Sequence, residues 1–351
     1  MKKIAYLGMD VHAGHCVLGQ MDFNGNFIGN KTFPTSEQNI IEALKAVKAR
    51  NKFLAMEEGT LAYWVAQVAK PYVTEVISSD PKENALIFRS PNKKDKVDTK
   101  KLCRLLRLGE LKRVYQPEND DRAIFKAAVQ HYIDLRDQQI SLKNKIKAMY
   151  RHWGVIDVAG EAVYGMKKRH DYLKRVKHVY IQNQLHRLYH LMDETQSMQN
   201  NALKAMKQLG RKYPEIKEFK RIPGIGDILA HIFDAFIQTP ERFEKRSQLW
   251  RYCRLGVTDR SSDGKPLGYK RLDRSGVSEL KSIAYQAWLS AMRGDNEVKR
   301  FYSESLRRTF NRVHARLNTE RKILAVMYGI WKRGEAYSPQ RFLDSSQIGV
   351  V

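Results

Sequence analysis

Residues 4–33, IAYLGMDVHAGHCVLGQMDFNGNFIGNKTF, decide the class of fold that the sequence predicts. Strand-forming residues occur there in three short runs, which are Ile4 to Gly8, Cys16 to Asp22 and Phe27 to Phe33. Ala13-Gly14 and Asn24-Gly25 supply the turn chemistry between the runs. The chain therefore opens with a meander of β-hairpins.

The sequence after Pro34 alternates between helical and strand-like segments. Thr35 and Gln38 form a capping-box pattern, and apolar residues then repeat at helical spacing, so a helix is predicted up to about Arg50. The next predicted elements are a strand, a helix and a strand, at residues 53–56, 60–70 and 73–77. Three antiparallel strands followed by this alternation imply a mixed sheet with helices packed on it, which is a layered α/β architecture.

Two long amphipathic segments follow, at residues 120–153 and 172–209, separated by a glycine-containing turn. They predict a helical hairpin or a coiled coil, and the imperfect heptad leaves pairing with a second copy open. Residues 211–351 are predicted to be mostly helical, with a long basic helix over 297–333. We expect three domains, at residues 1–118, 119–210 and 211–351.

The charge balance predicts a partner with dense negative charge. Lysine and arginine number 63 against 38 acidic residues, a net charge of +25, which favours nucleic acid or an anionic membrane. No apolar run approaches the ~20 residues of a membrane span. Asp10 and His12 interrupt the apolar N-terminal stretch too early for a signal peptide, so the cytoplasm is the expected location. Cys16, Cys103 and Cys253 lie too far apart for a zinc knuckle or a disulfide framework.

Four acidic residues form a candidate metal site. Asp10 and Glu57 each lie where a predicted strand ends, and neighbouring strands would bring both carboxylates to one edge of the sheet. Asp95 and Asp98 stand three residues apart at the start of a predicted helix, on one helical face. Converging carboxylates repel unless cations neutralise them, and hard oxygen ligands suit Mg²⁺ or Mn²⁺. Taken singly, each acid can equally be a turn former or a helix-terminus charge.

Two further segments of the C-terminal region are candidates for nucleic-acid contacts. Residues 221–226, RIPGIG, read as a helix-hairpin-helix turn in which Gly224 and Gly226 let backbone N–H groups approach phosphates, or as a plain glycine turn. Residues 255–265, LGVTDRSSDGK, read as a polar loop in which one of the two serines, Ser261 or Ser262, is a candidate nucleophile and Arg260 and Lys265 stabilise developing charge, or as a solvated surface loop.

These motifs together resemble a known family. Gly8-Met9-Asp10, Met56-Glu57-Glu58-Gly59-Thr60, Lys94-Asp95-Lys96-Val97-Asp98, Ile222-Pro223-Gly224-Ile225-Gly226, and Gly256-Val257-Thr258 with Ser261-Ser262-Asp263-Gly264-Lys265 occur in this order. The succession is similar to that of the DEDD insertion-sequence transposases related to Piv-type DNA invertases, and the resemblance spans nearly the whole chain.

The resemblance implies an RNase H-like (RuvC-like) mixed-sheet domain holding Mg²⁺, a coiled-coil insert, and a mostly helical transposase domain with a helix-hairpin-helix and a catalytic serine. The implied metal ligands are Asp10, Glu57, Asp95 and Asp98. It also implies a phosphoserine link to DNA and active sites shared between subunits of a homo-oligomer, a dimer or tetramer. Some members of the family use an element-encoded noncoding guide RNA, so DNA and an RNA are the expected partners.

Several alternatives stay open at the level of sequence. Glu58 directly follows Glu57 and competes with it as the ligand, as Ser261 competes with Ser262 as the nucleophile. The rival functions are a RuvC-like junction nuclease in which water attacks, and a non-catalytic architectural protein that holds DNA.

Overall fold

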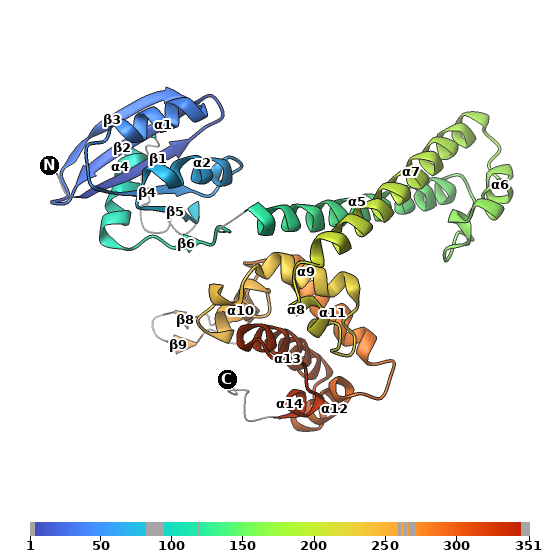
Figure 1. Cartoon of the computed structure of the whole chain (residues 1–351). Helices are drawn as coiled ribbons and strands as arrows, with labels where there is room; N and C mark the ends of the chain where they lie inside the picture. Colours follow the sequence, from blue (N-terminus) through green and yellow to red (C-terminus); the bar gives the residue numbers. More distant parts are fainter. Residues whose placement is uncertain are drawn as a thin grey trace. The chain divides into compact units, whose positions relative to one another are not determined.

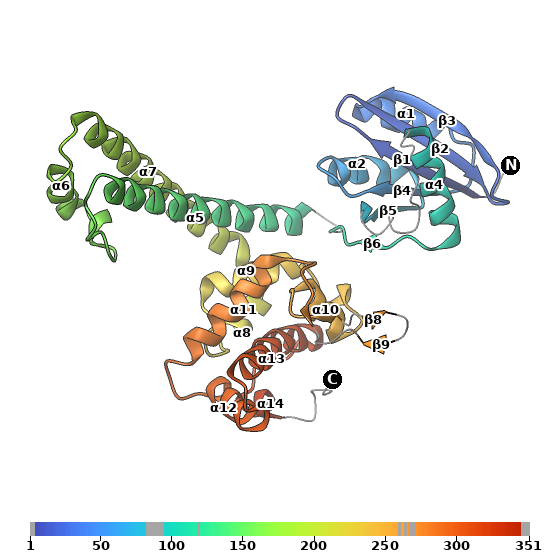
Figure 2. The same ribbon diagram turned by 180° about the vertical axis from the view of Figure 1, so that it is seen from behind.

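The computed structural model describes residues 4–81, 95–117, 120–258, 261–262, 265–266 and 271–344. The chain divides into two compact units, Met1–Gln116 and Pro117–Val351. Figure 1 labels the elements of both units, and Figure 2 shows the same ribbon from behind. Each unit is described by itself.

The first unit is built on a six-stranded mixed sheet with the order β3-β2-β1-β4-β5-β6. Its strands are β1 (Ile4–Val11), β2 (His15–Asp22), β3 (Phe27–Pro34), β4 (Asn51–Glu57), β5 (Glu75–Ser79) and β6 (Arg113–Val114). The first three strands form the antiparallel meander, and β4 and β5 continue the sheet in parallel with β1. The predicted mixed α/β sheet is therefore confirmed.

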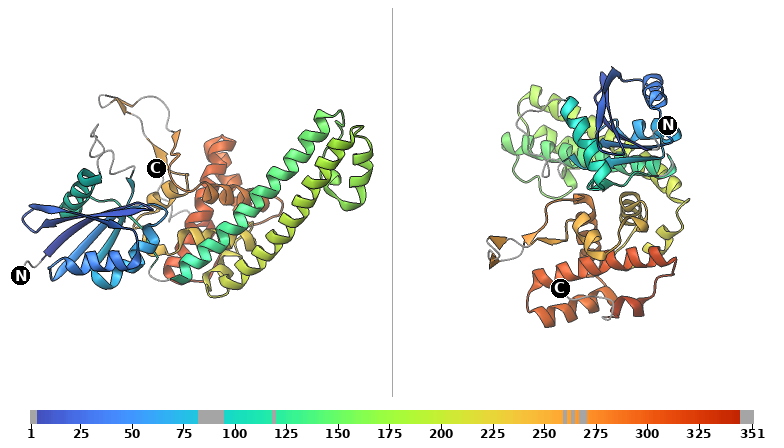
Figure 3. Two further views of the ribbon diagram at one scale, coloured as in Figure 1. Left: turned by 90° about the horizontal axis from the view of Figure 1, so that it is seen from above. Right: turned by 90° about the vertical axis from the view of Figure 1, so that its left-hand side faces the viewer.

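Helices cover both faces of this sheet (Figure 3, left). The helices α1 (Glu37–Ala46) and α2 (Ala62–Ala69) share a buried core with Leu7 and Met9 of β1. On the opposite face, α4 (Asp95–Leu108) packs Leu102 and Leu105 against Ala55 of β4. Successive strand residues alternate between these two cores, as the pleat requires.

The start of α1 differs from the predicted capping box. Ser36 is the N-cap, and its Oγ accepts a hydrogen bond from the backbone N–H of Asn39 at 3.2 Å. The hydroxyl of Thr35 instead donates to the carbonyl oxygen of His12 at 2.7 Å, so it ties the first hairpin to the loop before α1. The helix also ends at Ala46, earlier than the predicted Arg50.

Two long helices open the second unit. They are α5 (Asp120–His152) and α7 (Val179–Gly210), which lie side by side and run in opposite directions (Figures 1 and 2). Residues 172–209 were expected to be one helix, but α6 (Met166–Lys174) is separate from α7. A small core at the far end of the pair includes Tyr150 and Tyr189, whose hydroxyls lie 3.1 Å apart.

The remaining helices pack around one large hydrophobic core that also includes the near ends of α5 and α7. They are α8 (Glu215–Phe219), α9 (Asp227–Ile237), α10 (Arg246–Tyr252), α11 (Ser278–Ala291), α12 (Glu297–Thr309), α13 (Arg312–Arg333) and α14 (Pro339–Leu343). The single basic helix predicted over 297–333 is two helices, because Phe310 adopts a left-handed conformation (φ +50°) and Asn311 caps α13. The predicted division after residue 210 stays a prediction.

The segment predicted as a polar loop, residues 255–265, contributes to a set of short paired strands that continues to residue 272. They are β7 (Val257–Thr258), β8 (Ser261–Ser262), β9 (Lys265–Pro266) and β10 (Arg271–Leu272). β7 pairs with β10, and β8 pairs with β9, both antiparallel. We call these four strands the serine ribbon.

Over the described ranges, no helix combines the length and the apolar character that a membrane crossing requires.

Candidate active site

Asp10 and Glu57 occupy equivalent positions on neighbouring parallel strands. The ladder between β1 and β4 pairs Gly8 with Ala55 and Met9 with Met56, and the two acids each follow by one residue. Because side chains alternate along a strand, Asp10 shares the face of Gly8 and Glu57 shares the face of Ala55. Both acids therefore belong to the sheet face that α4 covers.

The helix α4 packs directly on this face through glycines. A Cβ atom on Gly8 would lie 2.5 Å from the carbonyl oxygen of Thr99 and 2.8 Å from Cβ of Leu102. A Cβ atom on Gly19 of β2 would lie 2.9 Å from Cβ of Thr99. This close approach fixes the first turns of α4 over the strand that carries Asp10, and Asp98 immediately precedes Thr99.

Asp98 and Asp95 both belong to the beginning of α4, as predicted. The carboxylate of Asp98 is 39% exposed and lies 3.3 Å from Nζ of Lys101. The backbone of Asp95 is the first of the helix, and its side chain lies outside the described part.

The surroundings of Asp10 include a histidine that sequence reasoning did not assign to the site. Oδ2 of Asp10 lies 3.3 Å from Nε2 of His12, and the aspartate side chain is 25% exposed. Burial raises the pKa of the Cys16 thiol, and the negative charge of Asp10 raises it further. The available signal for His12 was its position two residues after Asp10, at the end of β1.

Glu57 and Glu58 differ in their surroundings. Glu58 lies one residue past the end of β4, and its Oε2 accepts a hydrogen bond from Nε2 of Gln116 at 2.8 Å. Its backbone N–H donates to the carbonyl oxygen of Ser79 at 2.9 Å, which continues the sheet pattern beyond β4. Strand alternation therefore assigns Glu57, rather than Glu58, to the face shared with Asp10.

The described side chains form no group of three or more histidine, cysteine, aspartate or glutamate residues close enough to hold a metal ion. The side chain of Asp95, one of the four predicted ligands, is not among the described ones. The donor set nevertheless suits a hard divalent cation, because Asp10, Glu57 and Asp98 all supply carboxylate oxygens on the α4 side of the sheet. The complete ligand set stays a prediction.

The serine ribbon has a defined backbone register. Ser262 pairs with Lys265, whereas Ser261 pairs with Pro266. Ser262 and Lys265 are therefore directly opposite each other in the backbone ladder. Side chains of these residues, and all of Arg260, fall outside the described part of the chain.

The glycine turn lies between α8 and α9. Gly224 has φ +92°, and a Cβ atom there would lie 2.1 Å from the carbonyl oxygen of Ala287 in α11. Gly224 therefore meets a packing requirement of the fold. Gly226 is the N-cap of α9, and a Cβ atom there would have no neighbour within 4 Å. The side chain of Asp227 in the first turn pairs with Lys207 and Lys220, which lower its pKa to about 2.

Comparison with known families gives two matches. A DEDD family model of IS110 elements, described as "Transposase", matches residues 7–152, which include Asp10, Glu57, Asp95 and Asp98. A second model, described as "Transposase IS116/IS110/IS902 family", matches residues 216–303, which include the glycine turn and the serine ribbon. Together the matches cover about two thirds of the chain. No curated protein matches the sequence.

Proposed function

Since the chain belongs to the IS110 family of DEDD-type insertion-sequence transposases, which cut and rejoin DNA, we propose that four carboxylates and one serine perform this chemistry. Asp10, Glu57, Asp95 and Asp98 would hold Mg²⁺ or Mn²⁺. Bound there, such ions would activate an attacking oxygen and stabilise the leaving oxygen of a phosphodiester. The observation that carries the proposal is the register that puts Asp10 beside Glu57 on the face covered by α4.

The proposed nucleophile is Ser262. Its hydroxyl oxygen forms a bond to phosphorus while the bond from phosphorus to one DNA oxygen breaks, and the serine proton passes to that leaving oxygen or to solvent. A DNA hydroxyl then attacks the phosphoserine and releases the serine. The energy of the phosphodiester is retained in the serine ester, so rejoining needs no further energy source. Lys265, paired with Ser262 in the ribbon, would stabilise the developing negative charge.

A search for a covalent adduct tests this proposal. The protein is incubated with its native flanking DNA and Mg²⁺, denatured, and any attached DNA is sequenced. Wild-type protein and Ser261→Ala should retain an adduct at the element ends, whereas Ser262→Ala should retain none. An adduct that survives in Ser262→Ala would overturn the choice of serine. DNA cutting without any adduct would identify the rival nuclease, in which water attacks.

The contribution of DNA-binding residues is also part of the proposal. Backbone N–H groups of the turn at Gly224 and Gly226, and the side chains of Arg260 and Lys265, would contact phosphates. Asp227, in the first turn of α9, already forms ion pairs with two lysines. A phosphate would therefore contact the backbone of the glycine turn, not the first turn of α9. An architectural protein would keep its function in Asp10→Ala, whereas the proposed enzyme would lose strand cleavage and retain DNA binding.

The proposal has two further parts, which family membership alone supports. The first is that active sites are shared between subunits, and the second is that the protein uses a guide RNA. Mixing Asp10→Ala protein with Ser262→Ala protein should restore some recombination if each site takes its acids and its serine from different copies. Absence of rescue at every mixing ratio would count against shared sites. For the guide, recombination should require a noncoding RNA from the element, and full activity of RNA-free protein would exclude it.

A further inference from the structure

A cavity of about 470 Å³ opens between α10, α12, α13, α14 and the base of the serine ribbon. This volume lies within the range of roughly 300 to 1,000 Å³ that small-molecule sites occupy. Seven of its 21 lining residues are arginine or lysine, and none of the 21 is aspartate or glutamate. We call it the basic pocket. Its lining residues are spread between positions 246 and 341, so no local sequence pattern predicts it.

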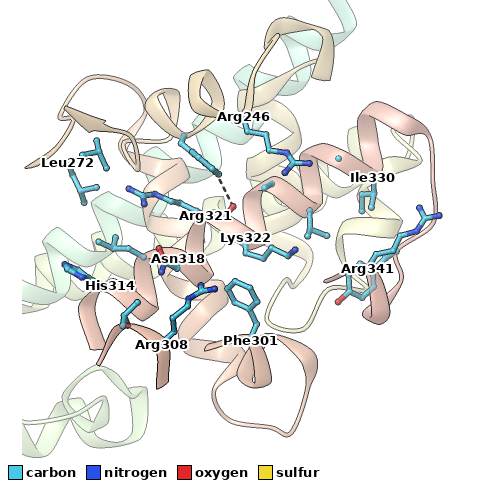
Figure 4. Close-up of a pocket in the computed structure, with 18 of the residues that line it drawn as sticks. Arg246, Leu272, Phe301, Arg308, His314, Asn318, Arg321, Lys322, Ile330 and Arg341 are labelled. Carbon is cyan, nitrogen blue, oxygen red and sulfur yellow. Dashed lines mark hydrogen bonds between the residues drawn. The ribbon is translucent and has the colours of Figure 1, made fainter. Parts of the chain in front are cut away.

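Three of these seven cations reach the hollow from different helices. Arg246 of α10, Arg308 of α12 and Lys322 of α13 approach it from three helices (Figure 4). Within the described part of the chain, neither Arg246 nor Arg308 forms an ion pair, whereas Arg333 and Arg341 both pair with Glu335. Arg246 and Arg308 therefore add positive charge to the basic pocket that no ion pair among the described residues neutralises.

Lys322 is the most constrained of the three. Lys322 is only 5% exposed, and its Nζ donates a hydrogen bond to the backbone carbonyl oxygen of Asp344 at 3.0 Å. Burial lowers the pKa of Lys322, and repulsion from Arg246 lowers it further. An anion bound between these two side chains would relieve the repulsion, which supplies a physical reason for affinity.

The other lining residues are mostly apolar or aromatic. Trp250, Leu317 and Val326 line the hollow, and the ring of Phe301 lies 5.7 Å from Nζ of Lys322. A ligand that contacts both the basic and the apolar lining residues would combine an anionic group with a flat apolar group. A nucleotide has this composition, and a base can stack on aromatic or apolar side chains only when it has left a duplex.

The position of the pocket connects it to the proposed chemistry. Val257 and Leu272 of the serine ribbon line it, and Ser262 follows Val257 by five residues. An extended chain of that length spans at most about 18 Å. Ser262 therefore lies within about 18 Å of Val257 at the edge of the basic pocket, and a strand of several nucleotides held there would reach the serine of the same chain.

We propose that the basic pocket binds one phosphate, together with its sugar and base, of a single-stranded nucleic acid segment next to the serine ribbon. This inference rests on the proposed function, because the strand would be part of the recombining DNA or of an RNA bound with it. The pocket would hold an unpaired nucleotide and so fix the strand's position along the ribbon.

The test compares two double variants of the full chain that remove the same charge. Arg246→Gln with Arg308→Gln changes the pocket, and the control Arg293→Gln with Arg307→Gln removes two exposed arginines that do not line it. Binding of fluorescein-labelled single strands of about ten nucleotides is followed by anisotropy, with oligothymidylate DNA and oligouridylate RNA as separate arms. Unfolding curves check that each variant folds, and Arg308→Gln alone replaces the double variant if Arg246→Gln disturbs α10.

The pocket variant should bind at least about tenfold more weakly than wild type, because it can no longer form charge-assisted hydrogen bonds to a phosphate. The slope of log K against log salt should also fall by about 0.7 for each phosphate that the variant no longer neutralises. The control should change much less. Equal weakening in both double variants, or in neither, would overturn the proposal. A weakening confined to one arm identifies the strand as DNA or RNA.

An oligothymidylate with an abasic central site tests the nucleoside part of the proposal. Wild-type protein should bind it more weakly than the intact strand, and equal binding would contradict the proposal that a base contacts the apolar residues of the pocket.

The adduct experiment separates this inference from the proposed mechanism. An adduct formed equally by pocket and control variants, with equal binding, would overturn the pocket alone. A pocket-dependent loss of binding without any wild-type adduct would instead overturn the phosphoserine step.

Discussion

Single residues explain how two acids and a helix come together in the first unit. Gly8 and Gly19 lack the Cβ atoms that would collide with α4, so the start of α4 rests on β1 and β2. Asp10 and Glu57 then stand on the same face of the sheet as that helix start, next to the last paired residues of β1 and β4. Like charges that are held close together disfavour the folded state unless a cation lies between them.

Removing one of these charges should therefore have opposite effects with and without metal. We predict that Asp10→Asn raises the melting temperature in EDTA, because one repelling charge is removed, and abolishes the rise that Mg²⁺ produces in wild type. Differential scanning calorimetry measures both. Glu42→Gln, an exposed carboxylate on α1, serves as the control and should keep the Mg²⁺ response. A full response in Asp10→Asn would remove Asp10 from the ligand set.

Glu320 gives a prediction about pH. It is 2% exposed, and burial raises its pKa from 4.5 to about 7 despite the positive charges of Arg316, Lys281 and Arg321. The folded state therefore holds a proton that the unfolded state releases between these pH values. Its contribution to the free energy of unfolding is full below about pH 4.5, falls as pH rises to about 7, and is constant above that.

The variant Glu320→Gln removes this dependence. The free energy of unfolding of wild type minus that of the variant should fall by up to about 3 kcal/mol between about pH 4.5 and about pH 8. Urea unfolding at several pH values measures this difference. A difference that stays constant with pH would show that the Glu320 carboxyl group titrates normally in the folded protein.

At the scale of elements, the turn between α8 and α9 shows how one segment can serve both packing and proposed binding. Gly224 meets the backbone of α11, while Gly226 faces open space and begins α9. The fold therefore requires glycine at position 224 because of packing, whereas at position 226 a larger side chain would meet no neighbour. The paired strands β8 and β9 make a similar point, because their backbone register pairs Ser262 with Lys265 and Ser261 with Pro266.

Alanine substitutions should separate the two glycines. Gly224→Ala places a Cβ 2.1 Å from the carbonyl oxygen of Ala287 at a positive φ, so it should lower the free energy of unfolding by about 2 to 4 kcal/mol. Gly226→Ala, its matched control, should cost less than about 1 kcal/mol. Thermal or urea unfolding of the full chain gives both values. Equal costs would contradict the close approach of α11.

At the scale of the whole molecule, the chain forms two compact units with separate cores. The sheet of the first unit has buried clusters on both faces, and the second unit has its own large core. A sheet covered on both faces has the burial that an independently folding domain requires.

Residues 1–116 should therefore fold when expressed alone. We expect a fragment with mixed α/β circular dichroism and a cooperative thermal transition, because the helices that cover both sheet faces are contained in it. The Asp10→Asn fragment should show the same gain in melting temperature in EDTA as the full-length variant. A fragment that stays unfolded would show that the first unit depends on the rest of the chain.

The sequence by itself determined the strands of the meander, the strand and helix alternation after them, the two long amphipathic helices and the order of the acidic motifs. These features depend on local periodicity, turn chemistry and residue type, which lie within a few residues of each other. It also carried the family resemblance that the two family matches support.

Only the tertiary structure decided which side chains meet. Strand register put Asp10 and Glu57 on the α4 face, and the packing of α11 gave Gly224 its constraint. Local signals also misled where a residue found a distant partner, as Thr35 did with His12 instead of capping α1. The basic pocket gathers side chains from helices far apart in the chain, and such convergence follows from packing, which no local pattern of residues encodes.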